Sequence, residues 1–409
     1  MQKRTLLTLL LACGALAGTT LNGTARADLL DPAPVKLGGV DLVPKLKLQE
    51  EYDDNFYSQV NTQEFWVQIL TLQLDALAPV GPHEYSAHYK TEAGVVESSS
   101  EDNYVDQSIY LRGFWDPDPR HRFELKGGYR QDHERRGTEN FQGSKAFTID
   151  ETPEFEESSV LGRYTYGADK SRGRLVLEAR GSDKTYMNLR ELTERSDRQN
   201  MEGTATFYWR VAGSLHGLLE ANQGEYDYVN DLEPRPGAVD TGDNDYTHLL
   251  AGVTWEAAGK TDGTLKVGRA EKNFTDADRE DFAGNSWYGE IKWKPRTYST
   301  FRLNTASRTE EPPTGRGDYV DVTEWGIDWR HAWSDRIASR VRYLQSDEIY
   351  KGDPEGREDT SILYGFDLDY AMRRWLVFRL FYTQDDHQSN LEEFDYPHAV
   401  TGISVRASL

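Results

Sequence analysis

Apolar and polar side chains alternate along residues 287–294, where the sequence reads Trp-Tyr-Gly-Glu-Ile-Lys-Trp-Lys. Neighbouring side chains of a β-strand point to opposite faces of the sheet. Trp287, Ile291 and Trp293 therefore share an apolar face, while Glu290 lies with the lysines on a charged face. The alternation recurs along much of the chain, and it fits a sheet with lipid on one side and water on the other.

Short and long connections alternate between the predicted strands. Short connections rich in Gly, Pro, Asp and Ser, which favour tight turns, are predicted at 79–82, 116–120, 167–172, 212–214, 258–262, 295–297, 333–335 and 370–374. Longer, acidic connections are predicted at 131–156, 188–200, 230–245, 275–284, 310–318, 351–359 and 385–395. Outer-membrane barrels have short periplasmic turns and longer extracellular loops. The pattern predicts an all-β fold, a single transmembrane antiparallel up-and-down β-barrel of about 18 strands spanning residues 40–409.

Two of the predicted strands fit the barrel pattern less well, and one other fold class has to be compared with the barrel. Residues 63–78 and 264–273 alternate less clearly, and a register error or a β-bulge is the expected cause. A soluble propeller is the competing class, but propeller strands are short and buried on both sides of each blade. Alternation up to Leu409 favours the barrel, because it resembles the terminal strand that the outer-membrane assembly machinery recognises.

Composition excludes a helical membrane protein but agrees with a barrel. Only 37% of the 409 residues are hydrophobic, 28% are charged, and the mean hydropathy is -0.74. A spanning helix needs about 20 mostly apolar residues, whereas a barrel strand needs only every second residue to be apolar. The 23 Tyr and 10 Trp residues suit aromatic girdles at the two membrane interfaces.

The N-terminus predicts export across the inner membrane. A short basic start precedes the apolar residues 6–17, and an Ala-Arg-Ala sequence follows, so cleavage of a signal peptide after Ala27 is predicted. The alternative is lipoprotein processing that makes Cys13 a lipidated N-terminus. A short periplasmic segment, 28–39, then leads into the barrel. The predicted location is the outer membrane of a Gram-negative bacterium.

The predicted water-facing side of the barrel carries both charges, with an excess of basic residues. Its acidic residues include Glu92, Glu124, Glu178, Glu220, Glu290, Glu324, Asp328, Asp367 and Asp369. One hypothesis is a pore in which basic residues attract an anionic solute. The candidate pathway residues are Arg112, Arg180, Arg210, Arg302, Arg330, Arg340, Arg342 and Arg379. The alternative is that opposite charges pair across strands and make the barrel rigid.

The formal net charge of -22 must then reside mainly in the loops, where acidic residues crowd 150–157 and 225–245. Such loops either bind divalent ions that bridge to lipopolysaccharide phosphates or are simply solvated. Outer-membrane lipid and lipopolysaccharide are therefore predicted partners, and no nucleic-acid partner is expected.

Enzyme signatures are absent from the sequence. The nine histidines are scattered, and there is no Gly-rich phosphate loop and no Cys/His cluster with metal-ligand spacing. No catalytic residue, metal site or cofactor is predicted.

Residues 46–57 contain Tyr52-Asp53-Asp54-Asn55 after an alternating strand. This segment resembles the start of a family of outer-membrane β-barrel proteins often encoded with exopolysaccharide or capsule biosynthesis genes. The resemblance implies export or surface presentation of a polysaccharide, together with periplasmic polysaccharide-export components. The basic lumen is similar in principle to that of alginate-export porins.

The predicted function is a passive porin-type channel for export of an anionic exopolysaccharide. The first alternative is a general or small-anion uptake porin. The second is a structural or adhesive surface barrel with a plugged lumen. The long connection 131–156 is the candidate for folding inward, and acidic loops would be the working surface of the adhesive barrel.

Overall fold

The computed structural model describes residues 32–168, 171–229, 242–257, 259–313 and 317–408. The predicted signal peptide 1–27, with Cys13 and the cleavage position Ala27, lies outside the described residues. The strands are β1 (Val35–Leu37), β2 (Val40–Asp53), β3 (Phe65–Val80), β4 (His83–Val96), β5 (Tyr104–Asp118), β6 (His121–His133), β7 (Glu154–Tyr166), β8 (Gly173–Tyr186), β9 (Arg198–Ala212), β10 (Leu215–Tyr228), β11 (Asn244–Ala257), β12 (Thr261–Phe274), β13 (Phe282–Arg296), β14 (Ser299–Glu310), β15 (Tyr319–Ala332), β16 (Ile337–Lys351), β17 (Glu358–Arg373), β18 (Leu376–Ser389) and β19 (Tyr396–Ser408). The helical turns are η1 (Ser100–Asp102), η2 (Glu139–Phe141), η3 (Gly143–Phe147), α2 (Arg190–Thr193), η4 (Glu194–Ser196) and η5 (Glu392–Phe394).

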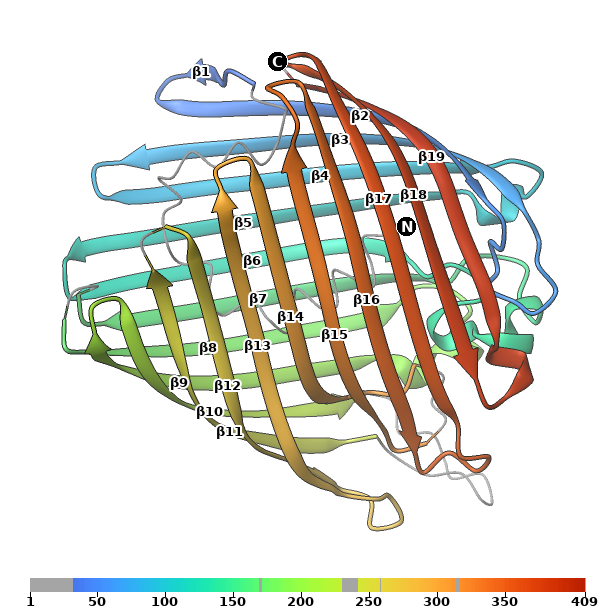
Figure 1. The fold of residues 1–409 in the computed structure, drawn as a ribbon. Coiled ribbons are helices and arrows are strands. Elements are labelled where there is room, and N and C mark those ends of the chain that lie inside the picture. Colours follow the sequence, from blue (N-terminus) through green and yellow to red (C-terminus); the bar gives the residue numbers. More distant parts are fainter. Residues whose placement is uncertain (1–31, 169–170, 230–241, 258, 314–316, 409) are drawn as a thin grey trace.

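Strands β2 to β19 form a closed antiparallel barrel of 18 strands (Figure 1). Consecutive strands pair with each other, and β19 pairs back onto β2 from Val400 opposite Asp53 to Ser408 opposite Lys45. Closure leaves no sheet edge with unpaired backbone groups facing hydrocarbon. The predicted fold class and strand number are confirmed.

The segment before the barrel forms a small hairpin. β1 pairs with the start of β2 across Gly38 and Gly39, and both glycines have a positive φ angle. Positive φ is easily reached by glycine because it has no Cβ. The alternation pattern did not indicate this hairpin within residues 28–39.

Short turns lie at one end of the barrel and long loops at the other (Figure 1). The turns include 81–82, 119–120, 213–214, 297–298, 333–336 and 374–375, and the loops include 54–64, 97–103, 134–153, 187–197, 275–281, 352–357 and 390–395. Because short turns face the periplasm in outer-membrane barrels, we call these ends periplasmic and extracellular. Some strands are longer than the sequence predicted. For example, β18 continues to Ser389, although a loop was expected to begin at residue 385.

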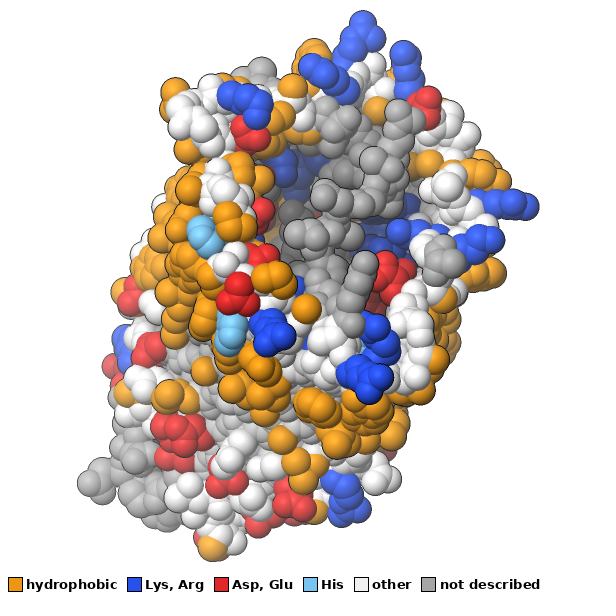
Figure 2. Space-filling model, turned by 90° about the vertical axis from the view of Figure 1, so that its left-hand side faces the viewer, with side chains coloured by type: hydrophobic (Ala, Val, Ile, Leu, Met, Phe, Trp, Pro, Cys, Tyr) orange, Lys and Arg blue, Asp and Glu red, His pale blue; other side chains and the backbone are white. Residues whose placement is uncertain are grey.

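The two faces of the strands have the predicted chemistry. On the outer face, Val267 is 64% exposed and Trp293 is 45% exposed, whereas the inward Asp367 is only 3% exposed. In β13 the inward Tyr288 hydroxyl donates a hydrogen bond to Glu290 at 2.9 Å. Figure 2 shows hydrophobic side chains covering the outer wall. The lipid therefore meets apolar side chains, and the charges line the lumen.

The weak alternation of β3 has a cause other than a bulge. Val67 and Ile69 face inward and pack against Phe56 and Tyr57 of the loop 54–64. The pairings of β3 show no register shift. An apolar inward face is stable here because a loop, and not water, covers it. In β12 the pairing is also regular, and polar residues occupy outward positions near the loops, where the wall rises above the hydrocarbon.

Aromatic side chains gather on the outer wall near the periplasmic turns. Stacked or tilted ring pairs join Phe301 with Trp293 and Trp329 across neighbouring strands. Trp255 lies over Gly263 of the next strand, where an added Cβ would come within 2.6 Å of the ring. Aromatic belts of this kind fix a protein at the membrane interface.

We expect Gly263→Val to destabilise the barrel by about 1 to 3 kcal/mol, because the new side chain must displace the Trp255 ring and crowd the backbone. Thermal unfolding followed by heat-modifiable gel mobility measures the effect. Gly203→Val is the matched control, since a Cβ added at this outward glycine meets nothing within 4 Å. Equal midpoints for the two variants would contradict the packing described for Trp255.

Candidate functional site: the lumen and its plug loop

Residues 134–153 fold into the extracellular mouth, and we call them the plug loop. Phe141, Ala146 and Ile149 are at most 5% exposed. The plug loop contacts loops from distant parts of the chain, because Gly143 accepts a hydrogen bond from Gln59 at 2.8 Å. The connection 131–156 was the candidate for folding inward, and its middle part, 134–153, packs against other extracellular loops, whereas its two ends belong to β6 and β7.

The plug loop passes so close to the loop 54–64 that one position requires glycine. Gly137 has a φ angle of 86°, and a Cβ added there would lie 1.6 Å from the backbone oxygen of Tyr57. Any other residue would force the two backbones apart.

Two arginines at the start of the plug loop hold it to the barrel wall. Arg135 donates to Asp53 at 2.8 Å, and Arg136 bonds both carboxylate oxygens of Asp102 at 2.8 and 2.5 Å. Tyr57 donates a further hydrogen bond to Asp102 at 2.7 Å. Burial alone would raise the pKa of the Asp102 carboxyl, but hydrogen bonds led by that from Arg136 hold this pKa below its usual value. Asp102 therefore stays ionised and keeps its partner.

A third arginine, in the loop 352–357, also contacts the plug loop. Arg357 is 1% exposed, donates to Gln142 at 3.0 Å and pairs with Asp359 at 2.6 Å. Its guanidinium also lies 3.6 Å from the ring centroid of Phe394. Cation–π contacts of this kind gain strength where water is excluded.

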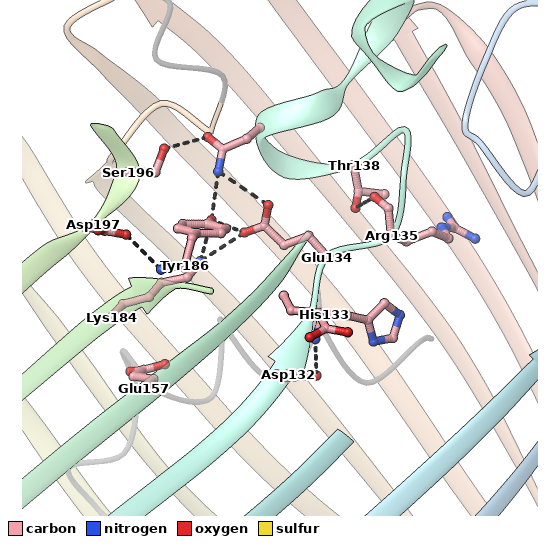
Figure 3. A network of polar contacts seen from close by, with 12 residues as sticks. Asp132, His133, Glu134, Arg135, Thr138, Glu157, Lys184, Tyr186, Ser196 and Asp197 are labelled. Carbon is pink, nitrogen blue, oxygen red and sulfur yellow. Dashed lines mark hydrogen bonds and ion pairs between the residues drawn. The ribbon is translucent and has the colours of Figure 1, made fainter. Parts of the chain in front are cut away.

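Figure 3 shows the polar network that holds the beginning of the plug loop to β8. Glu134 is 3% exposed and pairs with Lys184 at 2.9 Å, and it also accepts a hydrogen bond from Tyr186. Asn140 joins the network by donating to Tyr186 at 2.7 Å and accepting from Ser196 at 3.1 Å. The buried acid is thus fully paired, as a buried charge must be to avoid a large desolvation cost.

The motif Tyr52-Asp53-Asp54-Asn55 lies where β2, β19 and the plug loop meet. Asp53 pairs with Arg135 at 2.8 Å and with His398 at 2.9 Å. Asp54 accepts from the backbone of β19 at 2.6 Å, and Asn55 donates to the backbone oxygen of Pro397 at 2.7 Å. Tyr52 instead points outward and pairs with Trp66 at 5.4 Å between ring centroids. Three of the four motif residues therefore close the barrel seam and hold the plug loop.

Four arginines and three aspartates of the lumen form a ladder of ion pairs across β15 to β19. Arg340 pairs with Asp328, and Arg342 pairs with Asp367 at 3.0 Å. Arg379 bonds Asp369 at 2.7 and 2.8 Å, and Arg406 reaches the same carboxylate at 3.4 Å. This geometry matches the alternative in which opposite charges pair across strands, and a role of these arginines in cargo contact stays a prediction.

The other predicted pathway residues differ in their pairing. Arg112 contacts Glu84 and Glu124, both at 2.5 Å, and Arg180 contacts Glu178 at 3.3 Å. Arg330 lies in β15 and also takes part in a contact. Among the described residues, the side chains of Arg210 and Arg302 make no hydrogen bond or ion pair, and both lie near the periplasmic end. These two are the predicted residues best placed to meet a solute.

The sequence prediction missed the residues that hold the plug loop, namely Arg135, Arg136 and Arg357. They lie in connections that were expected to be acidic and external. The sequence did contain one indication, because an arginine within an otherwise acidic loop suggests an ion pair with a neighbouring carboxylate. Only the fold shows that each has a buried carboxylate partner.

The two ends of the barrel carry opposite charge. The loops are acidic, as in 275–281, which reads Thr-Asp-Ala-Asp-Arg-Glu-Asp, and in 390–395, which reads Asn-Leu-Glu-Glu-Phe-Asp. The described periplasmic turns instead carry Arg120, Arg172, Lys260, Arg336 and Arg374 against Asp335. Figure 2, seen from the side where the turn between β3 and β4 lies in Figure 1, shows Lys and Arg side chains around the rim of a hollow.

One group of potential metal ligands comes together in space. Ligand atoms of Asp106, Asp132 and His133 lie within 4.8 Å of one another. Ordinary contacts account for the group, since His133 bonds Asp106 at 2.8 Å and Asp132 pairs with Arg130 at 3.3 Å. The geometry calls for no metal.

We expect Asp102→Asn to open the mouth at neutral pH, because removing one partner of a buried ion pair costs about 3 to 5 kcal/mol. Arg136 would then lose its ionised partner. Single-channel conductance in planar bilayers measures the opening. Asp150→Asn is the control, because this exposed acid lies in the plug loop itself and has no buried partner among the described residues. Equal conductance of both variants would contradict the role of Asp102.

The wild-type plug loop should open in acid. The pKa of the Asp102 carboxyl is lower when the plug loop is in place. Ionised Asp102 therefore contributes fully to the stability of the closed loop above the ordinary carboxyl pKa of about 3.9. That contribution is lost as pH falls through the lowered pKa. Conductance should therefore stay constant from pH 8 to about 4 and rise below that; a rise beginning near pH 6 would point to histidines instead.

Comparisons with known proteins bear on the fold and on the family of the chain. Among the described residues, no helix is long and apolar enough to cross a membrane. No curated protein sequence matches the chain. The FrpB iron transporter of Neisseria meningitidis (F5-1 variant) has a similar structure, with a TM-score of 0.50 and 12% identity over 88% of this chain and 65% of that one. OccK3 (OpdO) of Pseudomonas aeruginosa gives a TM-score of 0.46 and 14% identity over 90% of this chain and 96% of that one.

These likenesses concern the fold alone, since identity is low. The family match is more specific, because residues 29–409 match the family described as "Putative beta-barrel porin 2". The chain is therefore an outer-membrane β-barrel of the porin type, and it belongs to this family.

Proposed function

We propose that this barrel is a passive channel through which an anionic exopolysaccharide leaves the cell. The observation that carries the proposal is the opposite charge of the two ends, with basic turns on the periplasmic side and acidic loops outside. The family supports transport, and nothing in the site suggests chemistry on a substrate.

Charge polarity favours movement of an anion outward. A cleft lined by one sign of charge, with low-dielectric walls, concentrates ions of the opposite sign. Basic residues at the periplasmic rim would therefore gather a polyanion at the entrance. Acidic loops would repel the same polymer once it has emerged, and they would hinder anions that approach from outside.

The paired lining of the lumen suits passage of a polymer. Conduction requires binding that is favourable enough for entry but weak enough for release. Arg342 and Arg379 are paired with aspartates, which partly neutralise their charge, so they would attract a passing polysaccharide only weakly. Arg210 and Arg302, which lack such partners among the described residues, offer stronger first contacts near the entrance.

The plug loop would restrict the channel to a thin cargo. Arg135, Arg136 and Arg357 hold it in place, so it narrows the mouth unless these contacts are released. A linear polysaccharide delivered by periplasmic export components is such a cargo. A narrow exit also limits leakage of small solutes.

A structural surface barrel is the second candidate function. The buried ion pairs that hold the plug loop favour it, because the cost of separating either partner would keep the loop in one closed position. In that case the acidic loops would be the working surface, with lipopolysaccharide as a partner through divalent ions. Uptake of small anions has less support, since the acidic loops surround the outer entrance.

We expect polygalacturonate fragments to block the channel at several-fold lower concentration from the periplasmic side than from the extracellular side, because the basic rim gathers polyanions. Current through single channels in planar bilayers measures the block. Dextran of the same length is the neutral control.

Replacing Arg120 and Arg374 by Gln should reduce the difference between the two sides, while Asp335→Asn should not. Equal block from both sides, or block by dextran alone, would count against export of a polyanion.

A further inference from the structure

A row of inward side chains crosses the wall at the level of the plug loop. Lys184 on β8 lies directly opposite Arg198 on β9, and Arg198 lies opposite Tyr228 on β10. Tyr186 and Tyr226 stand two positions away on the same face of their strands. Side chains opposite each other in an antiparallel sheet are close enough to interact.

The charged neighbours of Arg198 already have partners. Lys184 pairs with Glu134 at 2.9 Å. On the other side, Glu311 pairs with Lys272 and accepts a hydrogen bond from the Tyr228 hydroxyl at 2.7 Å. These contacts hold the charged side chains on the neighbouring strands in place on both sides of Arg198.

Arg198 itself has no such partner. Among the described residues its side chain makes no hydrogen bond or ion pair, and it is only partly exposed. A guanidinium carries five N–H donors in a planar fork that matches a carboxylate. Where a side chain is only partly hydrated, donors without partners favour an anionic ligand.

Tyr226 places an aromatic ring on the same face of the wall as Arg198. Its ring is partly exposed, lies 5.7 Å from the Tyr246 ring centroid, and its hydroxyl has no partner among the described residues. Lys272 lies 5.9 Å from the Tyr226 ring centroid. Aromatic faces offer a large, rigid apolar surface for the C–H groups of a ligand.

Glu139 supplies an oxygen from the plug loop. It has a φ angle of 50°, and its side chain makes no hydrogen bond or ion pair among the described residues. Asn140, the residue after Glu139, accepts a hydrogen bond from Ser196, which lies two residues before Arg198. Glu139 therefore lies in the part of the plug loop next to Arg198, and no hydrogen bond joins the two side chains among the described residues.

We propose that Arg198, Tyr226 and Glu139 form a binding subsite for one carboxylate-bearing sugar unit. The carboxylate would bind the Arg198 fork through two parallel hydrogen bonds. The sugar ring would pack on Tyr226, and a hydroxyl would bond Glu139. This inference rests on the proposed function, whose cargo it narrows to a uronate-containing polysaccharide that is held for a moment at the plug loop.

Calorimetric titration of the folded protein in detergent with trigalacturonate tests the subsite. The methyl ester of the same trisaccharide removes the charge and keeps the sugar. Arg198→Gln should weaken trigalacturonate binding about tenfold, because a bidentate charged contact is lost. Arg198→Lys should recover only part of that loss, because the ammonium has no planar fork.

Tyr226→Ala should weaken both ligands, and the weak binding of the methyl ester should not change in Arg198→Gln. Arg195→Gln is the matched control, an exposed arginine in the neighbouring loop. Heat-modifiable gel mobility confirms that each variant is folded. Unchanged trigalacturonate binding in Arg198→Gln, or equal losses in Arg195→Gln and Arg198→Gln, would overturn the subsite.

Titration does not depend on conduction, so its outcome is independent of the side-dependent block described above. A wild-type protein that shows the block but does not bind trigalacturonate would overturn the subsite and leave the proposed export function standing. Binding of trigalacturonate without any side-dependent block would overturn the proposed export function and leave the subsite standing.

Discussion

The need to pair every backbone N–H and C=O group in lipid is the constraint on which this structure depends. A sheet meets that need in a membrane only if it closes on itself. Pairing of β19 with β2 supplies closure here, across nearly the whole length of the chain. Once the sheet is closed, the twofold period of the strands puts apolar residues against lipid and leaves charges in the lumen. That is why a chain with 28% charged residues can span a membrane.

The plug loop shows how the interior is organised around paired charge. Arg135, Arg136 and Arg357 each carry a positive charge into a place with little water, and Asp53, Asp102 and Asp359 neutralise them. Buried pairs contribute little net stability compared with apolar packing, but the loss of one partner is costly. The contacts therefore specify one position of the loop and make that position sensitive to the ionisation of a few carboxylates. A porin-type channel with such a loop has a mouth that can be opened by breaking identifiable bonds.

Much of the fold could be predicted from the sequence, because alternation and loop length are local properties. The strand from Trp287 to Trp293, the even strand number and the two kinds of connection all follow from short segments. The weak pattern at Val67 and Ile69 could not be explained locally, since those residues are covered by a loop whose path depends on the closed barrel. The same holds for the lumen: sequence identifies Arg342 and Arg379 as inward, but only the register shows that each faces an aspartate. Arg198 gave no signal at all, since its lack of a partner is a property of the assembled wall.

Transport of an anion depends on the basic character of the lumen as it stands, after ion pairing and with the plug loop in place. The zero-current potential of the purified wild-type protein in a planar bilayer, under a tenfold KCl gradient, measures this most directly. The account predicts a potential with the sign set by chloride, because Arg210 and Arg302 near the entrance make no ion pair among the described residues. A potential with the sign set by potassium, or no conductance at any pH between 3 and 8, would contradict it.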